Sequence, residues 1–247
     1  MISAMNELKH LAEFKRILAN YQLSDEAKQL LARLRLTLLV GPSSSGRNTI
    51  INELLKSGAY HYIVSDTTRK PRVNDGIPEQ NGREYWFRTE EEVLQDLEAG
   101  LFLEAAVIHE QQVSGISMRE LATAVDEGKV AINEIEVVGA DNIHAAKPDA
   151  LFLFVLPPSF DEWIVRMNTR GQLPAEEVRR RLSSAVDELT IALDRDYYRF
   201  VVNDTFMHTA RAMDAMILEG KRSDEHQAEG VRVATQLLAD TKAFLEQ

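Results

Sequence analysis

The sequence predicts an α/β fold with a mainly parallel sheet, on three observations. Short apolar runs typical of strands alternate with longer segments of helical period along the 247 residues. One run, Leu36–Val40, leads through the turn GPSSSG into a helical pattern, the order of strand, loop and helix in such folds. Another, ALFLFVLPP, shows no polar alternation and stops at two prolines, as expected of a strand buried on both faces. With 45% hydrophobic residues, the chain can bury a sizeable core.

The hydrophobic pattern places five strands between the helical segments. They are predicted at Leu36–Val40, Tyr62–Val64, Val130–Ile135, Leu151–Leu156 and Phe200–Val202. Three helices are expected to begin with a capping box, in which a hydroxyl accepts from the N3 amide and a carboxylate reaches back. The pairs are Thr89 with Glu92, Ser117 with Glu120, and Ser159 with Glu162.

Two helical extensions are predicted outside this core, at residues 1–34 and 221–247. The first holds two amphipathic patterns, about Asn6–Ala19 and Asp25–Arg35, and the second a polar linker followed by one helix. Two interpretations remain open. The extensions pack on the core as a helical collar, or they offer a surface for a homo-oligomer or another protein.

Composition excludes several classes of protein. A formal net charge of −11 argues against binding a polynucleotide, because that affinity grows with the number of neutralised phosphates. No apolar run is long enough to span a membrane, and the N-terminal residues have helical period and do not resemble a signal peptide. The chain has no Cys, so neither disulfides nor thiolate metal sites are expected. A cytoplasmic location is the expectation.

The turn GPSSSG indicates a phosphate-binding loop. Gly41 and Gly46 stand five apart between a strand and the helical run Asn48–Lys56, where backbone amides and a helix N-terminus face an anion. Two glycines alone are weak evidence, because such a pair occurs by chance in a chain of this length. An ordinary turn between strand and helix is the alternative.

The rest of the chain resembles guanylate kinases. The segments GPSSSGRNT, SDTTRKPR with GREYWF, FLEAAV, INEIEVVGADNI, LFVLPPSFDEW, RGQLPAEEVRRRLSSAVDEL and FVVND follow in the family's order and approximate spacing. The resemblance implies a kinase domain at 35–220 with the P-loop nucleoside-monophosphate kinase fold, a GMP-binding insert at about 65–118 and a lid at about 166–181. The family reaction moves the γ-phosphoryl of ATP to GMP with Mg²⁺.

On the acceptor side, Arg69 and Arg72 stand three apart in a segment held extended by Pro71. Both guanidinium groups could grip one phosphate, although a solvated basic loop is the alternative. Guanine offers an N1–H and an amine as adjacent donors, which one carboxylate can accept together, and Glu104 holds the family position for this contact. The resemblance implies GMP-binding roles for Ser65, Arg69, Arg72, Tyr85, Glu104, Ser114, Ser117 and Glu134.

On the donor side, the resemblance implies an ATP site and a lid of arginines. Arg166 and Arg170 are four apart on a predicted helix that Gly171 ends, so they share a face. The ATP-binding candidates are Gly41, Ser43, Ser44, Ser45, Gly46, Arg47, Asn48, Thr49 and Asn203. The catalytic candidates are Arg47, Arg166, Arg170 and Arg181, and the metal candidates are Asn48 and Glu136.

The chain departs from the family pattern at the loop and on the acceptor side. Arg47 replaces the Lys that reaches the phosphates, Asn48 a hydroxyl that holds magnesium, and Ser44 a Gly. Ser114 takes the position of a phosphate-binding Tyr, and Ile116 that of a base-contacting hydroxyl, for which Ser117 is a substitute one residue away. The first three changes lower the expected rate.

Two functions therefore remain open. One is a guanylate kinase, or a relative acting on another nucleoside monophosphate, slowed by its altered loop. The other is an inactive guanylate-kinase-like module that binds a nucleotide or a protein. Retention of the three lid arginines together with Glu104 favours the enzyme.

Overall fold

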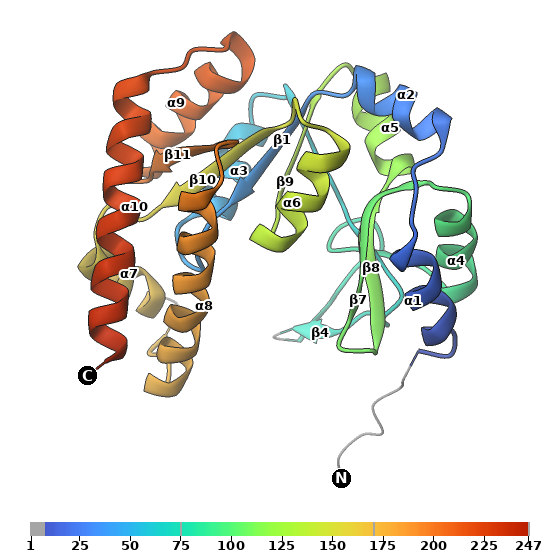
Figure 1. Ribbon diagram of the computed structural model, residues 1–247, viewed down its shortest axis with the longest axis horizontal. Helices are drawn as coiled ribbons and strands as arrows, with labels where there is room; N and C mark the ends of the chain where they lie inside the picture. The colour runs from blue at the N-terminus through green and yellow to red at the C-terminus, as the bar shows by residue number, and fades with distance from the viewer. Residues whose placement is uncertain (1–7, 75, 170, 247) are drawn as a thin grey trace. The chain divides into compact units, whose positions relative to one another are not determined.

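The computed structural model (Figure 1) describes residues 8–74, 76–169 and 171–246. The chain forms two compact units. The first holds residues 1–35, 61–131 and 145–148, and the second holds 36–60, 132–144 and 149–247.

The main sheet has five strands in the order β11-β10-β1-β9-β2. Their bounds are β11 Tyr198–Val202, β10 Leu151–Leu156, β1 Leu36–Val40, β9 Val130–Glu134 and β2 Tyr60–Tyr62. The pairs β1 with β10 and β10 with β11 are parallel, which confirms the predicted α/β fold with a parallel sheet. Every residue of β1 is buried, as expected of a central strand.

The strands β1 and β10 have the predicted bounds, whereas β2 lies two residues before the predicted segment. The reason lies in the first unit, where the amide of Val64 donates to the carboxylate of Glu120 at 3.1 Å and not to a strand. Strand β11 begins at Tyr198, two residues before the predicted start. The ring of Tyr198 is buried and packs against Phe154.

In the second unit, α10 packs against α8 and β11, and α3 packs against α9 (Figure 1). The helices are α3 Arg47–Leu55, α7 Phe160–Asn168, α8 Ala175–Asp194, α9 Phe206–Glu219 and α10 Asp224–Leu245, while α6, Val137–Ala146, crosses the boundary of the units. A Cβ at Gly230 of α10 would lie 2.4 Å from the Phe200 Cβ, so glycine permits this close approach. The predicted C-terminal helix therefore packs on the core of its own unit.

The first unit contains a sheet of four strands in the order β6-β3-β8-β7. The strands are β6 Trp86–Phe87, β3 Asp66–Thr67, β8 Gln112–Ser117 and β7 Phe102–Ile108, with a separate antiparallel pair, β4 Val73–Asn74 and β5 Ile77–Pro78. The helices are α1 Leu11–Ala19, α2 Asp25–Arg33, α4 Glu90–Glu98 and α5 Met118–Asp126.

The N-terminal helices pack within this unit, α1 on α4 and β7 and α2 on α5. Phe14 of α1 is fully buried in a cluster with Leu97 and Phe102. Helix α1 was predicted to start at Asn6, which lies outside the described residues. It starts at Leu11, because the Glu90 carboxylate accepts from the backbone amides of Lys9 and His10.

The three predicted capping boxes have different outcomes. Thr89 and Glu92 form the complete box. Ser159 accepts from the amide of Glu162, whose carboxylate accepts from a lid arginine. The third prediction is wrong: Ser117 makes no capping bond and donates to Asp66, while the Glu120 carboxylate accepts from the Trp86 indole at 2.8 Å. Buried partners far away in sequence outcompete the local cap. Among the described helices, none is long and apolar enough to cross a membrane.

Candidate functional site

A pocket of about 570 Å³ in the second unit collects most of the predicted donor-side residues. Those that line it are Ser43, Ser44, Gly46, Arg47, Asn48, Thr49, Arg166, Arg181 and Asn203. One cavity is therefore surrounded by residues from four places: the loop after β1, the end of α7, the first half of α8 and the segment just after β11.

The loop backbone explains why glycine is needed at two positions. Gly41 has φ of 136°, and a Cβ there would lie 2.3 Å from the Val155 carbonyl oxygen. Gly46 has φ of 99° and precedes α3. Ser44 also adopts a left-handed conformation, with φ of 66°, which most side chains disfavour by about 1–2 kcal/mol. The family glycine at this position is thus replaced by a strained serine.

Two buried side chains donate hydrogen bonds to the backbone of the loop. The indole of Trp163 donates to the Ser43 carbonyl at 2.8 Å, and the amide of Asn203 donates to the Ser45 carbonyl at 2.8 Å. Trp163 is fully buried and Asn203 is 3% exposed. Asn203 was predicted on the ATP side, and its amide nitrogen bonds to the loop. Trp163 was not predicted, although a buried indole requires an acceptor.

The two substituted loop residues both contact Glu134 at the end of β9. The Nε of Arg47 lies 3.5 Å from Glu134 Oε2. Asn48, oriented so that its hydrogen bonds are satisfied, donates to both Glu134 oxygens at 2.9 Å. Glu134, predicted on the GMP side, therefore lines the pocket of the loop.

Sequence patterns missed Glu188 of α8. Its pKa is raised to about 7, mainly by burial and to a smaller extent by the charges of Glu136 and Asp187, against the opposing charge of Arg47. Glu188 lies between Ala185 and Leu189 on the buried face of the helix. A charged residue at a core-facing helical position was the available signal.

The lid arginines are already engaged. Arg166 donates to the Asn203 and Asp204 carbonyls at 2.9 and 3.0 Å. Arg181 donates to Glu177 at 2.7 Å and lies 3.4 Å from the Ser43 hydroxyl. Arg170, predicted as a catalytic residue, lies outside the described residues.

The prediction that Gly171 ends the helix of Arg166 is wrong, because α7 ends at Asn168. The side chains of Asn168 and Thr169 donate to the carbonyls of Ile164 and Arg166, at 3.0 and 2.7 Å. These bonds satisfy the last turn before Gly171 is reached.

In the first unit, Arg69 is paired with a residue that sequence reasoning missed. Its two terminal nitrogens donate to Glu79 at 2.6 and 2.9 Å, and its charge lies 4.7 Å from the centre of the Tyr85 ring. Glu79 also accepts from the amide of Arg72 at 2.8 Å, and these bonds lower its pKa to about 2. Between Arg72 and Glu79 the chain forms the antiparallel pair β4 and β5, and Glu79 follows directly after β5.

The other acceptor-side candidates lie in or beside the same sheet. Ser65, half-buried, accepts at its carbonyl from the Trp86 amide at 2.9 Å. Ser114 donates to Thr67 at 2.8 Å, and Ser117 is 2% exposed with its hydroxyl on Asp66. Ser117 was predicted to replace a base-contacting hydroxyl. Its hydroxyl is instead buried and bonded to Asp66 in this structure. Glu104 is half-buried on β7, and its burial raises its pKa to about 7.

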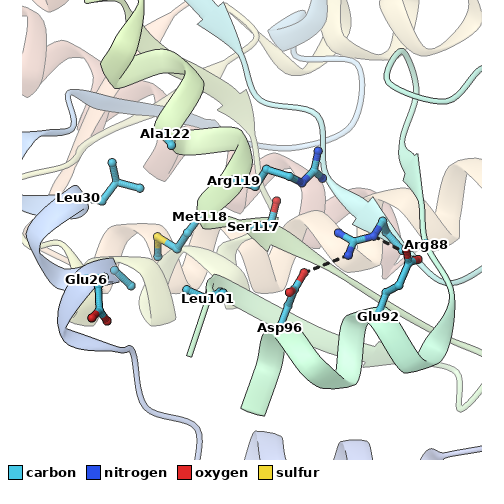
Figure 2. Close-up of a pocket in the computed structure, with 11 residues that line it drawn as sticks. Glu26, Leu30, Arg88, Glu92, Asp96, Leu101, Ser117, Met118, Arg119 and Ala122 are labelled. Carbon is cyan, nitrogen blue, oxygen red and sulfur yellow. Dashed lines mark hydrogen bonds and ion pairs between the residues drawn. The ribbon is translucent and has the colours of Figure 1, made fainter. Parts of the chain in front are cut away.

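A second pocket of the first unit, about 630 Å³, lies between α2, α4 and α5 (Figure 2). Arg88 contacts Asp96 at 3.1 Å and Glu92 at 3.4 Å, and it also donates to the buried Asp66 at 2.9 Å. Arg119 pairs with the same Asp66 at 2.9 Å. Both arginines of this pocket therefore pair with carboxylates of their own unit.

Comparisons with known proteins agree with this architecture. A family model described as guanylate kinase matches residues 33–220. The guanylate kinase of Trichormus variabilis is 35% identical over 184 residues, covering 74% of this chain and 89% of the relative. That of Rhodococcus jostii is 37% identical over 175 residues, covering 70% and 82%.

A solved structure supports the fold. The crystal structure of guanylate kinase from Anaplasma phagocytophilum superposes with a TM-score of 0.54 at 24% identity, covering 84% of this chain and 94% of that one. Together with the parallel sheet and the phosphate-loop geometry, this similarity establishes the P-loop nucleoside-monophosphate kinase fold. The family model and the relatives show that the chain belongs to the guanylate kinase family.

Proposed function

We propose that the protein transfers the γ-phosphoryl of ATP to GMP, at a rate lowered by its altered loop. The observation that carries this proposal is the pocket of the second unit, where Arg47, Arg166 and Arg181 line one cavity with the loop before α3. Phosphoryl transfer depends mainly on positioning two polyanions and neutralising the charge on the moving group. Three guanidinium groups beside a helix N-terminus suit that task.

GMP is the proposed acceptor. Arg69 and Tyr85 are in contact, and Arg72 is exposed three residues along. Because Glu79 occupies both ends of the Arg69 fork, the phosphate would share or displace that carboxylate. Glu104 would accept from the two adjacent donors of guanine.

Magnesium is the proposed cofactor, entering with ATP. Within the part of the chain that the structure describes, no group of three or more His, Cys, Asp or Glu side chains could hold a metal alone. Mg²⁺ commonly takes one or two protein ligands and otherwise phosphates and water. Asn48 lines the pocket of the loop, and its side-chain oxygen, together with the predicted Glu136 carboxylate, would supply the protein ligands. When bound, it would neutralise charge on the ATP phosphates.

Restoring the family loop should accelerate the reaction. Arg47→Lys combined with Asn48→Ser returns the compact ammonium and the hydroxyl, and we expect about a 10-fold higher kcat. A coupled ADP-release assay with ATP and GMP measures both proteins. Arg232→Lys, an exposed residue paired with Glu229 at 2.5 Å, is the control for an Arg-to-Lys change.

An inactive binding module is the second candidate, favoured by the contacts of Arg47 and Asn48 with Glu134. These contacts occupy the two groups that would serve ATP. Background ADP release from both the wild type and the restored variant, together with measurable GMP binding, would select this alternative.

GMP affinity should rise with pH if Glu104 contacts guanine. With a pKa of about 7, this carboxyl is largely protonated at pH 6 and largely ionised at pH 8, and only the ionised form accepts both guanine donors. We expect about 10-fold tighter binding at pH 8 than at pH 6. Calorimetry is done with guanosine in place of GMP, because guanosine has no phosphate that titrates in this pH range. The affinity of the Glu104→Gln variant should not change with pH. A pH-independent affinity in the wild type would contradict the contact.

A further inference from the structure

The segment that joins α1 to α2 is bonded to the start of strand β7. The hydroxyl of Tyr21 donates to the Phe102 carbonyl and accepts from the Phe102 amide, both at 2.7 Å. The amide of Ser24 donates to the Gly100 carbonyl at 3.1 Å. Gly100 has φ of 69°, and a Cβ there would lie 2.5 Å from the Ser24 amide, so glycine permits this approach.

Phe102 is also where the register of β7 on β8 shifts. Phe102 pairs with Ser117, and Glu104 pairs with Ile116, so β7 carries one extra residue, Leu103. Such a bulge bends the strand and changes its twist. Because side chains alternate between the faces of a strand, an extra residue also decides the face on which Glu104 projects.

We infer that Tyr21 is a positioning residue for Glu104, and that its hydroxyl holds the Phe102 backbone so that the bulge keeps Glu104 aimed at guanine. This inference rests on the proposed function. Tyr21 lies before residue 33, where the match to the guanylate kinase family begins. The N-terminal helices therefore contribute to base recognition in this chain.

The packing around this contact keeps Tyr21 in place. Strand β7 is at the edge of its sheet, where backbone groups lack a neighbouring strand. Phe14 of α1 and Phe102 are both fully buried in one cluster, and the Leu8 amide donates to the Glu110 carbonyl beyond the other end of β7. Helix α1 and its two flanking segments thus cover this edge.

The test is Tyr21→Phe, which removes the hydroxyl and keeps the ring. In the free protein, hydrogen exchange of amides 100–106 should become about 10-fold faster, because the Phe102 amide and carbonyl lose a partner. The dissociation constant for GMP should rise about 10-fold. The preference for GMP over IMP, which lacks the exocyclic amine, should fall, while the KM for ATP stays unchanged.

Two further variants sharpen the result. Tyr197→Phe removes a hydroxyl that donates to Asp141 at 2.6 Å in the second unit, and it should leave exchange at 100–106 and the GMP-to-IMP ratio unchanged. Gly100→Ala strains the neighbouring anchor without altering Tyr21. It should shift the same ratio in the same direction.

The possible failures are distinguishable. If the wild type binds GMP and Tyr21→Phe keeps both its affinity and its GMP-to-IMP ratio, the inference is overturned and the proposed function stands. If the wild type binds no GMP, the proposed function fails, and the assignment of Tyr21 to guanine recognition fails with it. Unchanged exchange at 100–106 overturns the structural part of the inference in either case.

Discussion

Glu104→Gln should weaken GMP binding by about 100- to 10,000-fold and remove the preference for GMP over AMP. A carboxylate can accept from both N1–H and the amine of guanine, and each bond to a charged acceptor contributes about 1.5–3 kcal/mol. An amide keeps one acceptor and turns a donor toward the other guanine donor. Calorimetry with GMP and AMP on both proteins measures the change.

The variant should fold normally, so the loss can be assigned to recognition. Burial already raises the pKa of Glu104 to about 7, which means that the free protein holds this carboxyl partly neutral near neutral pH. Gln has the same shape and no charge to bury. Glu98→Gln, on an exposed carboxylate of α4, is the matched control and should bind GMP as the wild type does. Equal affinity of the wild type for GMP and AMP would contradict the role of Glu104.

Arg181→Ala should lower kcat by about 1000-fold, with the GMP affinity unchanged. Arginines that neutralise the transferring phosphoryl contribute about 10³–10⁵ in rate, and Arg166 and Arg47 remain in the pocket to supply part of that charge. The GMP-binding candidates Arg69 and Glu104 belong to the other unit. Steady-state ADP release at saturating ATP and GMP, combined with GMP calorimetry, separates the two effects.

The neighbouring arginine offers a close control. Arg180 pairs with the same Glu177, at 2.8 Å, but is more exposed and does not line the pocket. Removing either arginine leaves Glu177 paired with the other, so both variants should lose less than about 1 kcal/mol of stability. Similar rates for Arg180→Ala and Arg181→Ala would show that Arg181 has no special role in the transfer.

Much of the core could be predicted from the sequence. Strands β1 and β10 have the predicted bounds because unbroken apolar runs between turn residues allow few other structures. The capping box of Thr89 and Glu92 formed as predicted because its partners are only three residues apart and no buried group among the described residues takes the Thr89 hydroxyl. Ser117 has the same local pattern, but the buried Asp66 takes its hydroxyl.

The candidate site divides in the same way. The positions of the loop, of Arg69 and of Arg181 follow from spacing and from the family register. The partners of Arg69 and of the loop do not: Glu79, Glu134 and Trp163 reach them from 10, 87 and 120 residues away. No periodicity in a single sequence encodes such pairs, because it reports which face of an element is buried and not which groups meet there.

The fold class, the phosphate loop and the family were thus settled by local patterns of hydrophobicity and by a collinear series of motifs. Three-dimensional packing decided which polar groups meet. Arg47 and Asn48 contact Glu134, both terminal nitrogens of Arg69 donate to Glu79, and Tyr21 bonds to the strand that carries Glu104. The physical reason is that hydrophobic burial follows short-range periodicity, whereas hydrogen bonds and ion pairs depend on the distance and angle between groups that only folding brings together.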